Sequence, residues 1–372
     1  MWITPEAPPA LPLKGATLAD RRSRIRGVRL MPALPRRPHP QRRLPRRSAA
    51  ALLTVAQFGP HERERPMPSV STAPANNPVA SFYGGNRAVR WLGAMLRTTH
   101  RMAPALGTRL TMRLFFTPMP PKWVARRKLL PQGWRIDSLP FDGGKLAVWR
   151  HTDIEATAER PRVLLVHGWA GDALQMRALG DALHAAGFEP VLLDFPGHGR
   201  SDGWRSTLPQ FVRALFAVSS RLGPWHAVVA HSLGALASAH AAGRGLPVQR
   251  LALLAPSPPP SPFIAWFARS FGLADAAAQQ LRASIERREG VPLAQFEPEW
   301  IAPRLAQPTL LIHDRDDRVA PQAVSERLVR LLPRAELRAT EGLGHRRLLG
   351  DAGVAAAVID HLQIDDTPPV TG

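Results

Sequence analysis

The sequence predicts an α/β protein built on a mostly parallel sheet of about eight strands with helices on both faces. Short apolar runs alternate with amphipathic helical patterns over the C-terminal two-thirds of the chain. Such continuous apolar runs are typical of parallel strands buried on both faces. The runs lie at 162–167, 190–195, 226–231, 250–256, 309–314 and 335–340, after an expected hairpin.

The hairpin is predicted over 134–151, where two extended runs flank the turn signal Asp142-Gly143-Gly144. Helical periodicity follows at 173–187 and 323–332. More than fifty residues separate the strands expected at 250–256 and 309–314, and they begin with a proline run. This interval is too long for a plain crossover, so we expect a lid insertion of two helices at about 256–303.

Residues 1–80 are predicted to be a disordered segment rich in proline and arginine. Residues 1–66 carry 14 basic and four acidic side chains, which is half of the net charge of +20. Three interpretations stay open: translation that begins at Met67, a basic tail for an acidic partner, or a targeting peptide. Since the charge is concentrated there, no specific nucleic-acid site is expected.

Residues 81–125 form an amphipathic helical segment with an expected break near Pro104. An apolar stripe (Val89, Trp91, Leu92, Met95 and Leu96) lies beside a basic one (Arg87, Arg90, Arg97 and Arg101). Such a helix either packs on a core or lies on an anionic membrane surface. Weak peripheral membrane association is therefore one interpretation of a chain that, without cysteine, fits the cytoplasm.

Polar clusters follow four of the expected strands, at the edge where open parallel sheets place their sites. They are 167–172, 230–235, 313–321 and 341–347, and they bring serine, aspartate and histidine in that order along the chain. Here the chain resembles the α/β-hydrolase family over about residues 130–365, within a domain expected at 126–372. The resemblance implies the α/β-hydrolase fold for this domain.

The resemblance implies a catalytic triad. Ser232, in Ala230-His231-Ser232-Leu233-Gly234, matches the nucleophile elbow, with alanine in place of the first glycine. His345 follows the last strand, where the family has its base. Asp317 matches the acid, although Asp314 and Asp316 are close enough to compete.

The same resemblance assigns the oxyanion-binding N–H groups to the backbone of Trp169 and Leu233. His167 is expected to orient that loop, and His198 is assigned no chemistry. Phe263, Trp266 and Phe267, on the first helix of the insertion, are candidates for a substrate pocket that takes an apolar acyl group.

These residues predict a serine hydrolase that cleaves a carboxylic ester or related acyl bond through an acyl-enzyme. A thioesterase or an acyltransferase on the same triad is an alternative, and so is a binding protein without catalysis. The spacings of zinc-binding helices and the glycine patterns of nucleotide sites are absent, so no metal and no cofactor are expected.

Overall fold

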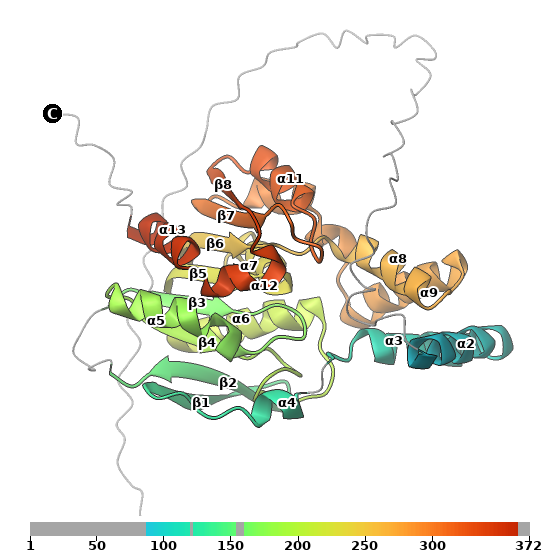
Figure 1. The fold of residues 1–372 in the computed structure, drawn as a ribbon. Coiled ribbons are helices and arrows are strands. Elements are labelled where there is room, and N and C mark those ends of the chain that lie inside the picture. The colour runs from blue at the N-terminus through green and yellow to red at the C-terminus, as the bar shows by residue number, and fades with distance from the viewer. Residues whose placement is uncertain (1–86, 120–121, 154–159, 364–372) are drawn as a thin grey trace, which may run out of the picture. The chain divides into compact units, whose positions relative to one another are not determined.

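The computed structural model describes residues 87–119, 122–153 and 160–363 (Figure 1). All of Met1–Val70 lies outside the described residues, which belong to Ser71–Gly372. The expectations for residues 1–80, including a start at Met67, therefore also fall outside the described part of the chain.

An eight-stranded sheet forms the centre of the described part, in the order β1-β2-β4-β3-β5-β6-β7-β8. β1 and β2 form the predicted hairpin, and β2 also runs antiparallel to β4. All other neighbours are parallel. The strands are β1 (Trp134–Phe141), β2 (Gly144–His151), β3 (Arg162–Val166), β4 (Glu189–Leu193), β5 (Trp225–His231), β6 (Val248–Leu254), β7 (Thr309–Asp314) and β8 (Ala335–Thr340). The predicted mostly parallel sheet is confirmed.

Side chains along each inner strand point alternately to the two faces of the sheet. In β3, Leu164 and Val166 join one buried cluster, while Val163 and Leu165 join the other. The first cluster packs under α6 (Leu208–Leu222), α7 (Leu233–Ala242) and α11 (Ala323–Leu331). The second packs under α5 (Arg177–Ala185) and α13 (Ala352–Gln363). Both faces are thus covered, as continuous apolar strands require.

The insertion after β6 begins with two helices, α8 (Pro260–Ser270) and α9 (Asp275–Glu289). Shorter turns follow: η2 (Leu293–Phe296), α10 (Pro298–Ile301) and η3 (Ala302–Arg304). These elements lie at the end of the sheet where β5 and β6 terminate (Figure 1).

The segment before the sheet forms α2 (Arg87–Met102), α3 (Pro104–Phe115) and the short α4 (Trp123–Arg126). The break falls at Ala103, directly before Pro104, because proline begins a helix more readily than it continues one. Leu96 and Phe116 are buried with Phe267 and Phe271 of the insertion. The segment therefore packs on the insertion helices.

No helix in the described part of the chain combines the length with the apolar character that a bilayer span requires.

Candidate active site

Ser232 lies at the corner between β5 and α7 in a strained backbone conformation. Its φ is 54° and its ψ is −120°, a region that non-glycine residues avoid at a cost of about 1–3 kcal/mol. The corner is held from both sides, because the Ser232 N–H donates to Leu254 O at 2.9 Å and its carbonyl accepts from the Ser257 N–H at 3.1 Å. The strain turns the serine out of the strand into the adjoining cavity.

Two glycines let the neighbouring chain approach this corner. A Cβ on Gly168 would lie 2.7 Å from the Ser232 Cβ, and one on Gly234 would lie 2.3 Å from the His167 carbonyl oxygen. Both distances are shorter than a carbon atom tolerates, so these positions require glycine. The alanine that replaces the first glycine of the family pattern, Ala230, is fully buried within β5.

The structure brings Ser232, His345 and Asp317 into one hydrogen-bonded chain. His345 Nε2 lies 3.0 Å from Ser232 Oγ, and His345 Nδ1 lies 2.7 Å from Asp317 Oδ2. The carboxylate fixes the proton on Nδ1, which leaves Nε2 to accept from the serine hydroxyl. His361, the other histidine near the C-terminus, instead pairs with the Leu251 carbonyl.

Asp317 is held as an anion by a dense set of donors. Its Oδ1 accepts from the N–H groups of Val319 and Ala320 at 2.7 and 2.9 Å, and His313 Nε2 lies 3.4 Å from its Oδ2. Burial by itself would raise the pKa of Asp317, but the hydrogen bonds from His313 and His345 outweigh it. The pKa of this carboxyl therefore lies well below its ordinary value.

The two competing acids have different partners. Asp314, at the end of β7, accepts from the Thr340 hydroxyl at 2.8 Å and the Leu343 N–H at 2.9 Å. Burial opposes ionisation of Asp314, but donors that include the Gly344 N–H lower its pKa overall. Asp316 accepts from the Gly342 N–H. Both acids thus brace the loop that carries His345 and do not contact the imidazole themselves.

The expected oxyanion donors both lie near the serine: Leu233 follows Ser232 directly, and Trp169 follows Gly168, which packs against Ser232. Neither N–H group donates a hydrogen bond to another described residue. Leu233 is the first residue of α7, so no preceding turn supplies an acceptor. Both N–H groups are therefore free to receive an oxyanion.

Two buried histidines shape the loop that carries Trp169. His167 Nδ1 donates to Gly168 O at 2.7 Å while its Nε2 accepts from the Phe195 N–H. His198 Nε2 accepts from the Ala170 N–H at 3.1 Å, next to Trp169. Burial lowers the pKa of His198 to about 3, so it stays a neutral acceptor. Its role in positioning the loop was missed, because sequence spacing does not show which backbone it meets.

Two further histidines that the sequence did not single out also support the site. His231 is buried directly before Ser232, and its Nε2 donates to the His345 carbonyl at 2.8 Å. His313 is fully buried in β7 behind Asp317 and contacts Ser325 and Ala320. A histidine inside an otherwise apolar strand is the one sequence signal that could have identified both.

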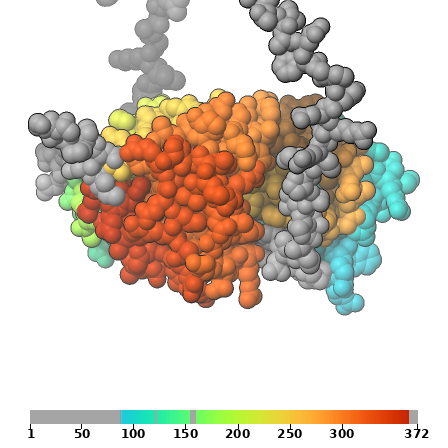
Figure 2. All heavy atoms as spheres, turned by 90° about the horizontal axis from the view of Figure 1, so that it is seen from above, coloured from blue at the N-terminus to red at the C-terminus, as the bar shows by residue number. Residues whose placement is uncertain are grey.

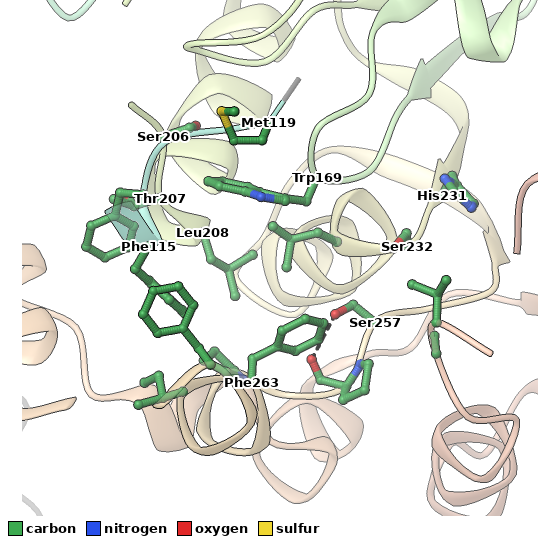
Figure 3. A pocket seen from close by; sticks show the side chains of 18 of the residues that line it. Phe115, Met119, Trp169, Ser206, Thr207, Leu208, His231, Ser232, Ser257 and Phe263 are labelled. Carbon is green, nitrogen blue, oxygen red and sulfur yellow. Dashed lines mark hydrogen bonds between the residues drawn. The ribbon is translucent and has the colours of Figure 1, made fainter. Parts of the chain in front are cut away.

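An apolar cavity opens at Ser232 (Figure 3). Ser232 and Trp169 lie at one side of it and Phe115 at the other, with Phe263 of α8 below. Its walls come from α3, α6 and the insertion, and include Phe116, Met119, Leu208, Ile264, Phe267, Ile285 and Leu293. The cavity can therefore take an apolar group beside the serine hydroxyl.

The predicted pocket residues are only partly in place. Phe263 and Phe267 line the cavity, but Trp266 does not; it packs edge-on against Phe263 at 5.4 Å between ring centroids. Side chains on one helical turn point in different directions, so only some of them can line the same cavity. The wall formed by Phe115 and Met119 was not predicted, because their segment precedes the hydrolase-like motifs in the sequence.

The described residues contain one cluster with metal-ligand chemistry, which the sequence spacing did not reveal. The ligand atoms of His151, Asp153 and His184 all lie within 4.8 Å of one another. The two rings are stacked at 3.7 Å with planes 18° apart. An ion must lie near the plane of each imidazole that binds it, so the rings would have to turn before both could bind one ion.

The fold and this corner define a class. A mostly parallel sheet with a strained serine between β5 and α7 is the architecture of α/β hydrolases. The family model described as alpha/beta hydrolase fold matches residues 161–306. The described part of the chain has the α/β-hydrolase fold.

Its distant homologues are esterases. The chain is 27% identical over 248 residues to the pimeloyl-[acyl-carrier protein] methyl ester esterase of Xanthomonas oryzae pv. oryzae (strain MAFF 311018), covering 54% of this chain and 93% of the relative. The enzyme of the same name from Stenotrophomonas maltophilia (strain K279a) is 27% identical over 250 residues, covering 56% and 95%. A solved membrane phospholipase A, described as a novel bacterial virulence factor, is 19% identical and covers 74% of this chain and 96% of its own, with a TM-score of 0.48.

Gly234→Ala tests the close approach at the corner. Because its methyl group would overlap the His167 carbonyl oxygen, we expect a loss of about 1–3 kcal/mol or more in the free energy of unfolding, measured with urea. Gly350→Ala is the control, since a Cβ there meets nothing within 4 Å, and should change stability by less than about 0.5 kcal/mol. Equal stability of the two variants would contradict the packing.

The buried histidines predict a loss of stability in mild acid. Burial lowers the pKa of His240 to about 4, against 6.5 in the unfolded chain, so the unfolded state binds a proton first as the pH falls. The stabilisation is complete above pH 6.5 and is lost progressively toward pH 4. His240→Phe should remove up to about 2 kcal/mol of the decrease between pH 7.5 and 5, seen in unfolding at each pH. An unchanged pH slope would refute this.

Proposed function

We propose that the chain is a serine hydrolase that cleaves a carboxylic ester of an apolar acyl group. The observation that supports this most is the hydrogen-bonded chain from Ser232 through His345 to Asp317 at the wall of an apolar cavity. The three residues come from three separate loops at strand ends. A binding protein would have no need for all three in this arrangement.

Acylation uses each of these groups in turn. Ser232 Oγ attacks the ester carbonyl carbon while His345 Nε2 takes the hydroxyl proton. The negative charge that develops on the carbonyl oxygen is received by the N–H groups of Trp169 and Leu233. His345 then gives its proton to the leaving alkoxide, which departs as an alcohol and leaves the acyl group on Ser232.

Deacylation repeats the chemistry with water as the nucleophile. His345 takes a proton from the water, the hydroxide attacks the acyl-enzyme, and the proton returns to Ser232 Oγ as the acid leaves. Asp317 stays ionised throughout, because its pKa is held low, and stabilises the imidazolium that forms in both steps.

The cavity supports an apolar acyl chain, and the relatives support an ester with a small alcohol. The relatives are named as methyl ester esterases of a carrier-bound acyl group. A thioesterase or an acyltransferase would share the acyl-enzyme and differ in the leaving group or the acceptor. A panel of methyl, p-nitrophenyl and thioesters of increasing chain length, with free acid as the measured product, separates these activities.

Replacing the nucleophile should remove reactivity and leave the fold intact. Ser232→Ala is expected to abolish labelling by a fluorophosphonate probe and to lower kcat by a factor of roughly 10⁴ or more. Ser257→Ala is the matched control, since Ser257 lines the same cavity but its hydroxyl donates to Pro258 O. Labelling that persists in Ser232→Ala, or disappears in Ser257→Ala, would overturn the assignment.

Two aspartate variants should separate the triad acid from the bracing acid. In Asp317→Asn the amide would donate to His345 Nδ1 and fix the wrong tautomer, so kcat should fall by about 10⁴ in a folded protein. In Asp314→Asn the amide would face donors from Thr340 and Leu343, so thermal stability should fall. The loss of kcat should be far smaller than in Asp317→Asn. The opposite ranking would make Asp314 the acid.

A further inference from the structure

Exposed apolar side chains are concentrated in one segment of the chain. Nine of the eleven large hydrophobic residues that are exposed among the described residues lie between 87 and 130. Met102 is 82% exposed, Leu129 is 89% exposed and Trp91 is 77% exposed. The other six are Met95, Leu106, Met119, Trp123, Val124 and Leu130. Scattered single residues would need no explanation, but a concentration of this kind marks an interaction surface.

The same segment contains basic residues and no acidic ones. Residues 87–130 contain ten lysines and arginines and no aspartate or glutamate. Within the described part of the chain, no ion pair is formed by Arg87, Arg90, Arg101, Arg109 or Arg113. We call the exposed residues Trp91, Met95 and Met102 of α2, with the neighbouring Arg87, Arg90 and Arg101, the basic apolar face.

Helix α2 has one packed side and one exposed side. Leu96 is buried against the insertion, and a Cβ on Gly93 would come within 2.9 Å of Phe271 O. At 3.6 residues per turn, Trp91, Met95 and Met102 fall within about 40° of one another on the outer side. The helix therefore packs on the insertion with one side and leaves an apolar strip bordered by arginines on the other.

The segment that carries the basic apolar face also forms part of the wall of the active-site cavity. Phe115 and Phe116 at the end of α3, and Met119 just after it, line the cavity, while Met119 is also 46% exposed. Figure 2 shows α2 and α3 beside the helices of the insertion, and α3 contacts α9. Because Met119 is exposed and also lines the cavity, an acyl chain can enter the cavity past Met119 from the surface of this segment.

We propose that the basic apolar face docks on the surface of an anionic lipid bilayer, so that apolar acyl esters reach the cavity from the lipid. Arginines attract acidic headgroups, and exposed tryptophan and methionine side chains enter the boundary with the acyl chains. An acidic protein or a nucleic acid would match the arginines but not the apolar strip. The inference about substrate entry rests on the proposed function, whereas docking itself does not.

Vesicle co-sedimentation of the full chain tests the docking. We expect binding to vesicles of phosphatidylcholine with phosphatidylglycerol, and weak binding to phosphatidylcholine alone or in high salt. Arg87→Gln, Arg90→Gln and Arg101→Gln together should weaken partitioning by roughly 100-fold, at about five-fold for each charge. The control replaces Arg42, Arg43 and Arg46 by glutamine, which removes equal charge from the N-terminal segment. A loss in the control variant alone would overturn the proposal.

A label tests whether the face enters the lipid. Because the chain has no cysteine, Met102→Cys provides one thiol for an environment-sensitive fluorophore. We expect its emission to rise and shift to the blue on anionic vesicles, while the same label on Leu331→Cys in α11 stays unchanged. No change at Met102, or an equal change at both sites, would contradict docking through this face.

Two measurements keep failure of docking apart from failure of the proposed function. Ser232→Ala should bind vesicles as the unchanged chain does, since binding needs no chemistry. The triple arginine variant should hydrolyse a water-soluble short-chain ester at the normal rate but lose at least ten-fold against the same acyl group in anionic vesicles. Weaker binding of that variant to an acyl-carrier protein, with no vesicle binding in any form, would show a protein partner instead.

Discussion

The conformation of Ser232 is the constraint on which the rest of the site depends. A left-handed residue between β5 and α7 exposes the hydroxyl but costs free energy, so the surroundings must hold it. Leu254 and Ser257 do so through the backbone, and Gly168 and Gly234 let the next loop close over the corner. Because the loop is that close, the backbone of Trp169 lies near the same serine. The strain at Ser232 and the close approach of this loop are thus two consequences of one packing arrangement.

The proton-transfer side of the site depends on a second arrangement, in which hydrogen bonds hold Asp317, Asp314 and the loops beside His345. Asp317 receives donors from two histidines and two backbone N–H groups, so it orients His345 without competing for its proton. Asp314 does the same for the loop that carries His345. Burial that keeps His198 neutral makes it an acceptor for the Ala170 N–H. Low dielectric surroundings strengthen each of these contacts and make any unpaired one costly.

The sequence predicts the sheet well because strands buried on both faces leave an unmistakable apolar run. In the sequence, Ser232, Asp317 and His345 each follow an apolar run. The carboxyl ends of parallel strands lie at one edge of the sheet, so the three residues are expected to be close together. The sequence does not predict which side chains of α8 face the cavity, since Trp266 and Phe267 differ by one position but turn to different surroundings. Nor does it reveal contacts between distant segments, such as Phe115 against Phe267 at 5.1 Å between ring centroids. These depend on tertiary packing, which local periodicity does not encode.

That last contact explains why a segment outside the family pattern matters to the site. Without α3, the insertion would present Phe267 and Ile264 to water, and the cavity would lose one wall. Burial of those side chains therefore holds α2 and α3 on the insertion. The inner face of the segment is occupied by this contact. The outer face then has no apolar partner among the described residues, yet it keeps tryptophan, methionine and leucine side chains in water. A segment needed only as a wall would carry polar residues there, so its composition points to a second partner at the entrance of the cavity.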